Sequence, residues 1–130
     1  MKYALAVYGA PYASESSQTA LHFAMALLEK GHQITRVFFY HDGVYTANVL
    51  GVPPQDELDP LRPWHTFAET QGIELVVCVA AALKRGLLND VEAERYGKSG
   101  SNLDDKFEIA GLGQFIDAVI SSDKVITFGC

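Results

Sequence analysis

Cys78 is the residue of this chain that is best placed for covalent chemistry. It stands where a short, β-branched apolar run at residues 73–77 meets a segment at 79–86 that carries three alanines and then two cations. The run predicts a buried strand, and the segment predicts the start of a helix. Open α/β sheets place their chemistry at the carboxyl ends of strands. A thiol at this junction is therefore a candidate nucleophile, with its thiolate as the reactive form.

Two interpretations of Cys78 stand side by side at this point. Helix amides together with Lys84 or Arg85 would stabilise its thiolate, which favours a reactive role. Cysteine is also among the most buried residue types, and on spacing alone an inert core thiol is at least as frequent. The second cysteine, Cys130, is the final residue, and we expect it to be a surface thiol.

An aromatic and polar segment ends another expected strand. The run Phe38–Tyr40 leads into His41, Asp42 and Gly43. Because parallel strands end at one edge of a sheet, we expect this segment at the same edge as Cys78. An Asp-Gly pair after a strand is typical of a simple turn. The functional alternative is a polar and aromatic wall beside a reactive sulfur.

The turn at residues 9–12, which feeds the hydroxyl-rich stretch Ser14–Ser17, has the right position for phosphate binding at a helix N-terminus. It matches neither a dinucleotide fingerprint nor a Walker motif. Pro11 and Tyr12 would also hinder close approach of a ligand to the backbone. We therefore expect no nucleotide and no other cofactor.

The histidines do not predict a metal site. His22, His32, His41 and His65 show no paired ligand spacing, and the sequence has no Cys-x-x-Cys. We expect each of them to be an exposed or internally satisfied side chain.

Composition narrows the class of protein. The chain has 130 residues, of which 48% are hydrophobic, and this predicts one domain over residues 1–130 with its own core. Its formal charge of −6 argues against direct binding of nucleic acid, which needs clustered Lys and Arg. The apolar runs are far shorter than the roughly 20 residues that cross a bilayer. Two distant cysteines make no disulfide framework, so we expect a reducing cytoplasm.

Alternating periodicities predict the fold class. Strand-like runs at 3–8, 34–40, 73–77, 107–110 and 125–128 alternate with helical patterns, chiefly after Ser14, at 59–71 and at 112–121. We read residues 50–63, with four of the five prolines, as a surface loop, and residues 91–105 as a loop with a short helix at most. The pattern predicts an α/β protein: a three-layer α/β/α arrangement around a mainly parallel sheet of about five strands.

The ordered set of motifs resembles the DsrE/TusD family of sulfur-relay proteins over essentially the whole chain. The string around Cys78 is the most specific part of this likeness. The matching segments are 8–12 (YGAPY), 38–45 (FFYHDGVY), 78–86 (CVAAALKRG), 101–103 (SNL) and 111–113 (GLG).

The resemblance implies a sulfurtransferase in which Cys78 carries a persulfide. It implies a heterohexamer with two copies each of this chain, a DsrF-like subunit and a DsrH-like subunit. A small TusA-like protein would donate the sulfur, and a DsrC- or TusE-like protein would accept it. The likeness carries no role onto Cys130. Apolar helix faces and the run Phe38–Tyr40 also suggest apolar surface for such an assembly.

Several functions stay open beside this one. Within the family, overall likeness favours the branch that oxidises stored sulfur over the TusD-type branch that feeds tRNA 2-thiouridine. A flavodoxin-like cofactor binder would suit the parallel α/β pattern and the hydroxyl-rich helix start. A scaffold subunit with a purely structural cysteine would suit the burial that cysteine prefers.

Overall fold

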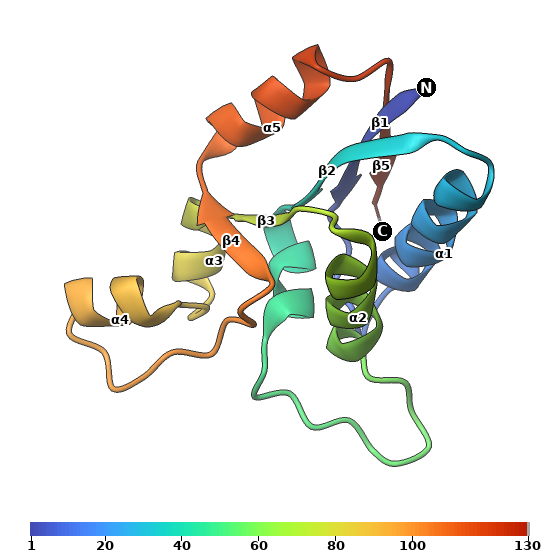
Figure 1. The fold of residues 1–130 in the computed structure, drawn as a ribbon. Helices are drawn as coiled ribbons and strands as arrows, with labels where there is room; N and C mark the ends of the chain where they lie inside the picture. The colour runs from blue at the N-terminus through green and yellow to red at the C-terminus, as the bar shows by residue number, and fades with distance from the viewer. Residues whose placement is uncertain (130) are drawn as a thin grey trace.

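The structure is a computed structural model that describes residues 1–129, so the expectation for Cys130 lies outside the described residues. Strands and helices alternate along the chain (Figure 1). In order, they are β1 (Lys2–Val7), α1 (Ser16–Glu29), β2 (Gln33–Phe39), the 3₁₀ helix η1 (His41–Ala47), α2 (Leu61–Gln71), β3 (Leu75–Cys78), α3 (Val79–Lys84), α4 (Asp90–Arg95), β4 (Phe107–Ala110), α5 (Leu112–Ile120) and β5 (Lys124–Phe128).

The strands form one five-stranded sheet in the order β4-β3-β2-β1-β5, and every strand pair is parallel. Successive crossovers carry the chain outward from β1 to β4, and α5 then leads it back to the other side of β1. Figure 1 shows α1 and α2 on one face of the sheet and α5 on the other. The predicted α/β class with three layers is confirmed.

Most element boundaries agree with the periodicity, and two local features differ. Gly31 has φ +85 just beyond the end of α1, as expected of a helix terminator. The hydroxyl cap of α1 lies earlier than a standard N-cap, because Ser14 Oγ accepts from the backbone N–H of Ser16 at 3.1 Å while Glu15 is the flanking residue. Cys78 itself belongs to β3 rather than to the turn after it.

Large apolar side chains fill the face beneath α1 and α2. Trp64 is fully buried and packs edge-on against Phe39, with ring centroids 5.2 Å apart. Its indole Nε1 donates to Ser17 Oγ at 3.1 Å, and Ser17 in turn lies 3.2 Å from Thr46 Oγ1. A buried indole N–H needs an acceptor, so this chain of bonds fixes the positions of α2, α1 and η1 relative to one another.

The opposite face is only partly covered. Phe115 of α5 stacks on Phe38 of β2 with ring centroids 5.1 Å apart. Within α5, all of which the structure describes, Ala118 is the one buried residue. Phe38 and Phe39 are themselves buried, so the expectation that the run Phe38–Tyr40 supplies apolar surface is wrong for those two residues. Exposed aliphatic side chains lie on α5 and in the loop before α2 instead.

The segment after β2 is a 3₁₀ helix rather than the simple turn that Asp42-Gly43 predicts. The N–H of Gly43 lies 3.1 Å from the carbonyl oxygen of Tyr8 and 2.9 Å from that of Tyr40. A Cβ at residue 43 would overlap the carbonyl of Val7. The absence of a side chain here therefore lets η1 lie directly against the end of β1.

Among residues 1–129, every helix is too short or too polar to cross a bilayer.

A buried carboxylate ties α2 to the segment before β4. Both carboxylate oxygens of Asp104 lie within 2.9 Å of His65 Nδ1, and Asp104 also accepts from the N–H of Lys106 at 3.1 Å. Asp105 lies farther away, at 3.8 Å from His65. One nitrogen of His65 and one carboxylate oxygen each of Asp104 and Asp105, the atoms that could bind a metal ion, lie within 4.8 Å of one another. Sequence spacing gave no hint of this group, because its members come from different elements.

We predict that Asp104→Ala lowers the free energy of unfolding by about 1–3 kcal/mol, because it leaves a partly buried imidazole and a backbone N–H without their acceptor. Asp104 is 9% exposed. Urea denaturation followed by circular dichroism measures the change. Asp105→Ala is the matched control: its side chain is 88% exposed, and we expect a change below about 0.5 kcal/mol. Equal losses in both variants would contradict the anchoring role of Asp104.

Candidate active site around Cys78

Cys78 occupies the junction that the sequence predicts for it. It is the last residue of β3 and also the residue before α3, with φ −64 and ψ 125. In the sheet it pairs in register with Ala110, the last residue of β4. Its side chain is 3% exposed and belongs to the hydrophobic core. The thiol thus lies at the carboxyl edge of the sheet, but beneath the surface.

The pleat of the sheet sets the direction of the thiol. Val76 pairs with Phe38, and side chains two residues apart in a strand point to the same face. Cys78 therefore shares the face of Phe38, which stacks against Phe115 of α5. This is the incompletely covered face of the sheet, and α5 begins two residues after Ala110, the partner of Cys78.

An aromatic cluster lies at the same edge, where β1 and β2 end. The rings of Tyr8 and Tyr40 have centroids 5.5 Å apart, and the imidazole of His41 lies 5.8 Å from Tyr8 and 4.7 Å from Tyr40. The backbone of His41 lies in the left-handed region, with φ 49. Residues other than glycine rarely adopt this conformation. The expected aromatic and polar group thus exists, centred on the exits of β1 and β2.

The two cations after Cys78 do not lie as the sequence suggests. Arg85 Nε donates to Asp42 Oδ1 at 2.8 Å, and its Nη1 donates to the carbonyl oxygen of Ala81 at 3.1 Å. Lys84 is the last residue of α3, roughly 9 Å along the helix from Cys78 at 1.5 Å per residue. The local group suited to stabilise a thiolate is instead the start of α3, where backbone N–H groups lack helical acceptors.

The Arg85–Asp42 ion pair is a feature that sequence reasoning missed. It joins the end of α3 to η1, two segments that lie 43 residues apart in the chain. Each segment is notable in the sequence by itself, but no spacing rule links them. The pair fixes the far end of the short helix whose first turn follows Cys78.

The turn at residues 9–12 packs closely against the start of α1 at Gly9. A Cβ on Gly9 would overlap Ser16 Oγ. The neighbouring cavity is lined by Tyr12, Glu15 and Glu57. Partial desolvation, with the carboxylates of Asp59 and Glu57 nearby, raises the pKa of Tyr12 above its usual value. A cavity with two carboxylates in its lining does not favour the phosphate of a flavin or nucleotide, which argues against the flavodoxin-like alternative at this position.

The chemistry that this arrangement could support is exchange at the Cys78 thiol. A thiolate at Cys78 would be a nucleophile toward sulfur and would need no second side chain for exchange with a persulfide or disulfide. With the thiol 3% exposed, such an exchange would require access to it. The elements next to Cys78 are α3, which follows it in the chain, and the end of β4, which pairs with it in the sheet.

Known proteins resemble this chain over nearly its whole length. A model of the DsrE/DsrF-like family matches residues 1–128. The protein named putative sulfurtransferase DsrE of Allochromatium vinosum is 47% identical over 129 residues, or 99% of each chain. The sulfurtransferase TusD of an Enterobacter species is 45% identical over 128 residues, covering 98% of this chain and 100% of the relative. The TusD homologue of Pseudomonas aeruginosa is 46% identical and covers 99% and 98%.

A solved structure is similar over the same span. The crystal structure of the YchN protein from E. coli matches with a TM-score of 0.71 and 26% sequence identity, covering 98% of this chain and 100% of that one. The likeness therefore extends over the whole domain rather than over the Cys78 segment alone.

We predict that Arg85→Gln speeds the alkylation of Cys78 by iodoacetamide about fivefold, since a surface ion pair contributes up to about 1 kcal/mol to holding α3 closed. The measurement uses the native protein in a Cys130→Ser background, with mass spectrometry counting the modified chains over time.

Arg95→Gln is the matched control, because Arg95 pairs with Glu92 within α4, away from Cys78. Its alkylation rate should equal that of the parent. If Arg85→Gln and Arg95→Gln react alike, the Arg85–Asp42 pair does not govern access to the thiol.

Proposed function

The chain belongs to the DsrE/DsrF-like family, and from that membership we propose that it is a sulfurtransferase of a sulfur relay in which Cys78 carries the sulfur as a persulfide. The observation that carries this proposal is the position of Cys78, the one cysteine among residues 1–129, at the end of β3 and directly before α3. Relatives named sulfurtransferase over their full length support it.

The proposed chemistry is two successive exchanges at sulfur. The Cys78 thiolate attacks the outer sulfur of a donor persulfide; a new S–S bond forms at Cys78, the donor's S–S bond breaks, and the donor leaves as a thiolate. An acceptor thiolate then attacks the outer sulfur on Cys78 and releases the Cys78 thiolate. One S–S bond replaces another in each step, so no electron donor or acceptor is needed.

Burial suits the carrier between those steps. A persulfide is open to oxidation and to exchange with any small thiol that reaches it. A side chain that is 3% exposed in the free chain meets such reagents only during brief openings of the segments around it. In this proposal the partner proteins prolong these openings, while a small reagent such as polysulfide uses the brief ones.

The partners and the pathway are the finer part of the proposal. A TusA-like protein donates the sulfur, and a DsrC- or TusE-like protein accepts it, in the cytoplasm, where thiols are kept reduced. We assign the relay to oxidation of stored sulfur rather than to tRNA thiolation. The support is the identity to DsrE of 47%, against 45% and 46% for the two TusD relatives.

We predict that polysulfide adds one sulfur atom to the native chain at Cys78 and that Cys78→Ser abolishes this addition without changing the far-ultraviolet circular dichroism. Mass spectrometry of the intact protein and of its tryptic peptides locates the sulfur. Cys130→Ser is the matched control and should still load. Uptake by the Cys78→Ser chain would refute the assignment, and reaction of Cys78 only after unfolding would make the chain a scaffold subunit.

Assembly with related subunits is the second part of the proposal. Leu112, Ile116 and Ile120 of α5 are 49%, 56% and 77% exposed, on a helix whose one charged residue is Asp117. Adjacent aliphatic side chains at such exposure are typical of a protein interface rather than of a solvated helix. The α5 face is the face of Cys78, so DsrF-like and DsrH-like subunits packed there in a heterohexamer would shape the approach to the thiol.

We predict that Ile116→Asp removes the chain from a co-expressed complex of about six subunits, because it places a charge in the apolar centre of the contact. Size-exclusion chromatography with light scattering gives the mass. Val91→Asp on α4 is the control, since Val91 is similarly exposed but lies on another helix, and its complex should be intact. A complex that withstands Ile116→Asp would exclude α5 from the interface.

A further inference from the structure

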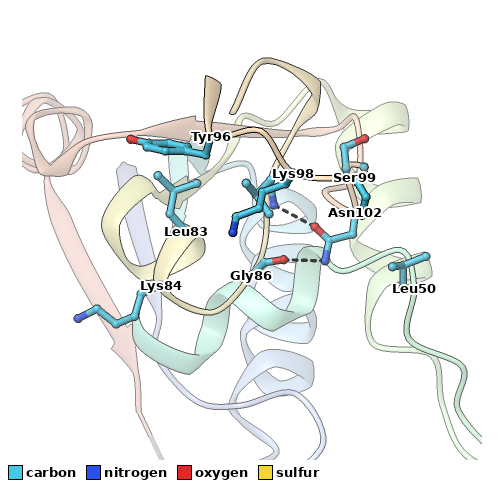
Figure 2. A pocket seen from close by; sticks show the side chains of 11 residues that line it. Leu50, Leu83, Lys84, Gly86, Tyr96, Lys98, Ser99 and Asn102 are labelled. Carbon is cyan, nitrogen blue, oxygen red and sulfur yellow. Dashed lines mark hydrogen bonds between the residues drawn. The ribbon is translucent and has the colours of Figure 1, made fainter. Parts of the chain in front are cut away.

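An open groove of about 970 Å³ lies beside the C-terminal end of α3. Its wall includes Leu83 and Lys84 of α3, Tyr96 after α4, Lys98, and Leu50 from the loop before α2. Figure 2 shows the ring of Tyr96 next to Leu83, with Lys98 extending between them and Gly86, and Leu50 at the opposite end. Apolar side chains thus form the floor, and amines and hydroxyls stand around it.

The groove is a built feature of the fold. Asn102 Oδ1 accepts from the N–H of Leu88 at 2.9 Å, and its Nδ2 donates to the carbonyl oxygen of Gly86 at 3.0 Å. The N–H of Asn102 also donates to the carbonyl oxygen of Leu88 at 2.9 Å. These bonds, two of which are drawn in Figure 2, hold the loop after α4 against the segment after α3. Asn102 therefore has a structural role, because its hydrogen bonds fix two segments that line the groove relative to each other.

The charge of the groove is opposite to that of the chain. The protein has sixteen acidic and ten basic residues, yet the side chains that line the groove include two lysines and no acid. Asp90 accepts from Ser101 Oγ of the lining at 2.6 Å and does not itself line the groove. The cavity beside α1, by contrast, is lined by Glu15 and Glu57. A local positive field on an acidic protein selects anionic partners and speeds their encounter.

The groove is joined to Cys78 by α3 itself. Leu83 and Lys84 end the helix that begins at the residue after Cys78, so this end of the groove lies roughly 9 Å along the helix axis from residue 78. A ligand in the groove would contact the same short helix that limits access to the sulfur. Its volume of about 970 Å³ far exceeds that of an inorganic anion and is large enough for several side chains of a partner.

We infer that this groove binds an extended segment of a protein that exchanges sulfur with Cys78, a segment that combines apolar side chains with Asp or Glu. The inference rests on the proposed function and adds to it the place and the chemistry of docking. Leu50, Leu83 and Tyr96 receive the apolar side chains, and Lys98 and Lys84 pair with the carboxylates. The partner thereby lies along α3 with its sulfur directed toward the start of the helix.

The test measures the two successive sulfur transfers: from the TusA-like donor protein to Cys78, and from loaded Cys78 to the DsrC- or TusE-like acceptor. Lys98→Glu should raise the KM for at least one of these proteins about tenfold and leave kcat within about twofold, because the lysine acts in docking and not at sulfur. Lys30→Glu, the same charge change at the end of α1, should leave both KM values unchanged. Unchanged KM values for both proteins in Lys98→Glu would overturn the inference.

The apolar part of the groove has its own matched pair. Leu50→Ser should raise the same KM, whereas Val52→Ser should not, because Val52 lies in the same loop and is 90% exposed but is outside the groove lining. Equal effects of the two variants would count against the groove.

Loading of Cys78 by polysulfide separates this inference from the proposed function. If the parent chain takes up no sulfur from polysulfide, the proposed function fails. If Lys98→Glu slows polysulfide loading as much as it slows protein transfer, the groove holds a small anion and the docking inference is wrong.

Discussion

Parallel pairing of β3 between β2 and β4 is the constraint on which the rest of the site depends. Every strand of the sheet runs in one direction, so each strand exit lies on one edge. Cys78, the Tyr8–Tyr40–His41 cluster and the start of α5 all reach that edge for this reason alone. The glycine at 43 then lets η1 lie against β1, which brings Asp42 within reach of Arg85. The strand pairing thus determines which segments lie at the same edge of the sheet as the sulfur of Cys78.

The burial of Cys78 and its proposed reactivity both depend on its position between β3 and α3. A thiol inside the core is shielded from solvent, and Cys78 comes directly before α3, whose first backbone N–H groups lack helical acceptors. Such a thiol does not react until a movement of the neighbouring segments exposes it. The segments next to it are α3, a six-residue helix whose C-terminal end is joined to η1 by the Arg85–Asp42 ion pair, and the end of β4. In the proposed relay, partner contacts on α3 would couple exposure of the sulfur to the arrival of the correct protein.

Much of the fold could be predicted, because its signals are local. Strand-like runs and helical spacing found every strand and the three long helices, and Gly31 lies just beyond the end of α1 as a helix terminator. The 3₁₀ helix after Tyr40 was missed, since its conformation comes from close approach to β1 and not from its own residues. Likewise the Arg85–Asp42 and His65–Asp104 contacts join residues about forty positions apart. The sequence places Cys78 correctly but misleads about the cations after it, because the direction of a side chain is a tertiary property.

The strand order also bears on how the chain is made. β1 is the first strand to leave the ribosome, yet one of its two neighbours, β5, is the last. During synthesis β4-β3-β2-β1 can pair as each arrives, while the outer edge of β1, with residues from Tyr3 to Val7, keeps its backbone groups open. An open edge of a buried, apolar strand invites pairing with another chain. Arrival of residues 124–128 closes that edge, so the final strand protects the nascent domain from joining to its neighbours as well as completing its sheet.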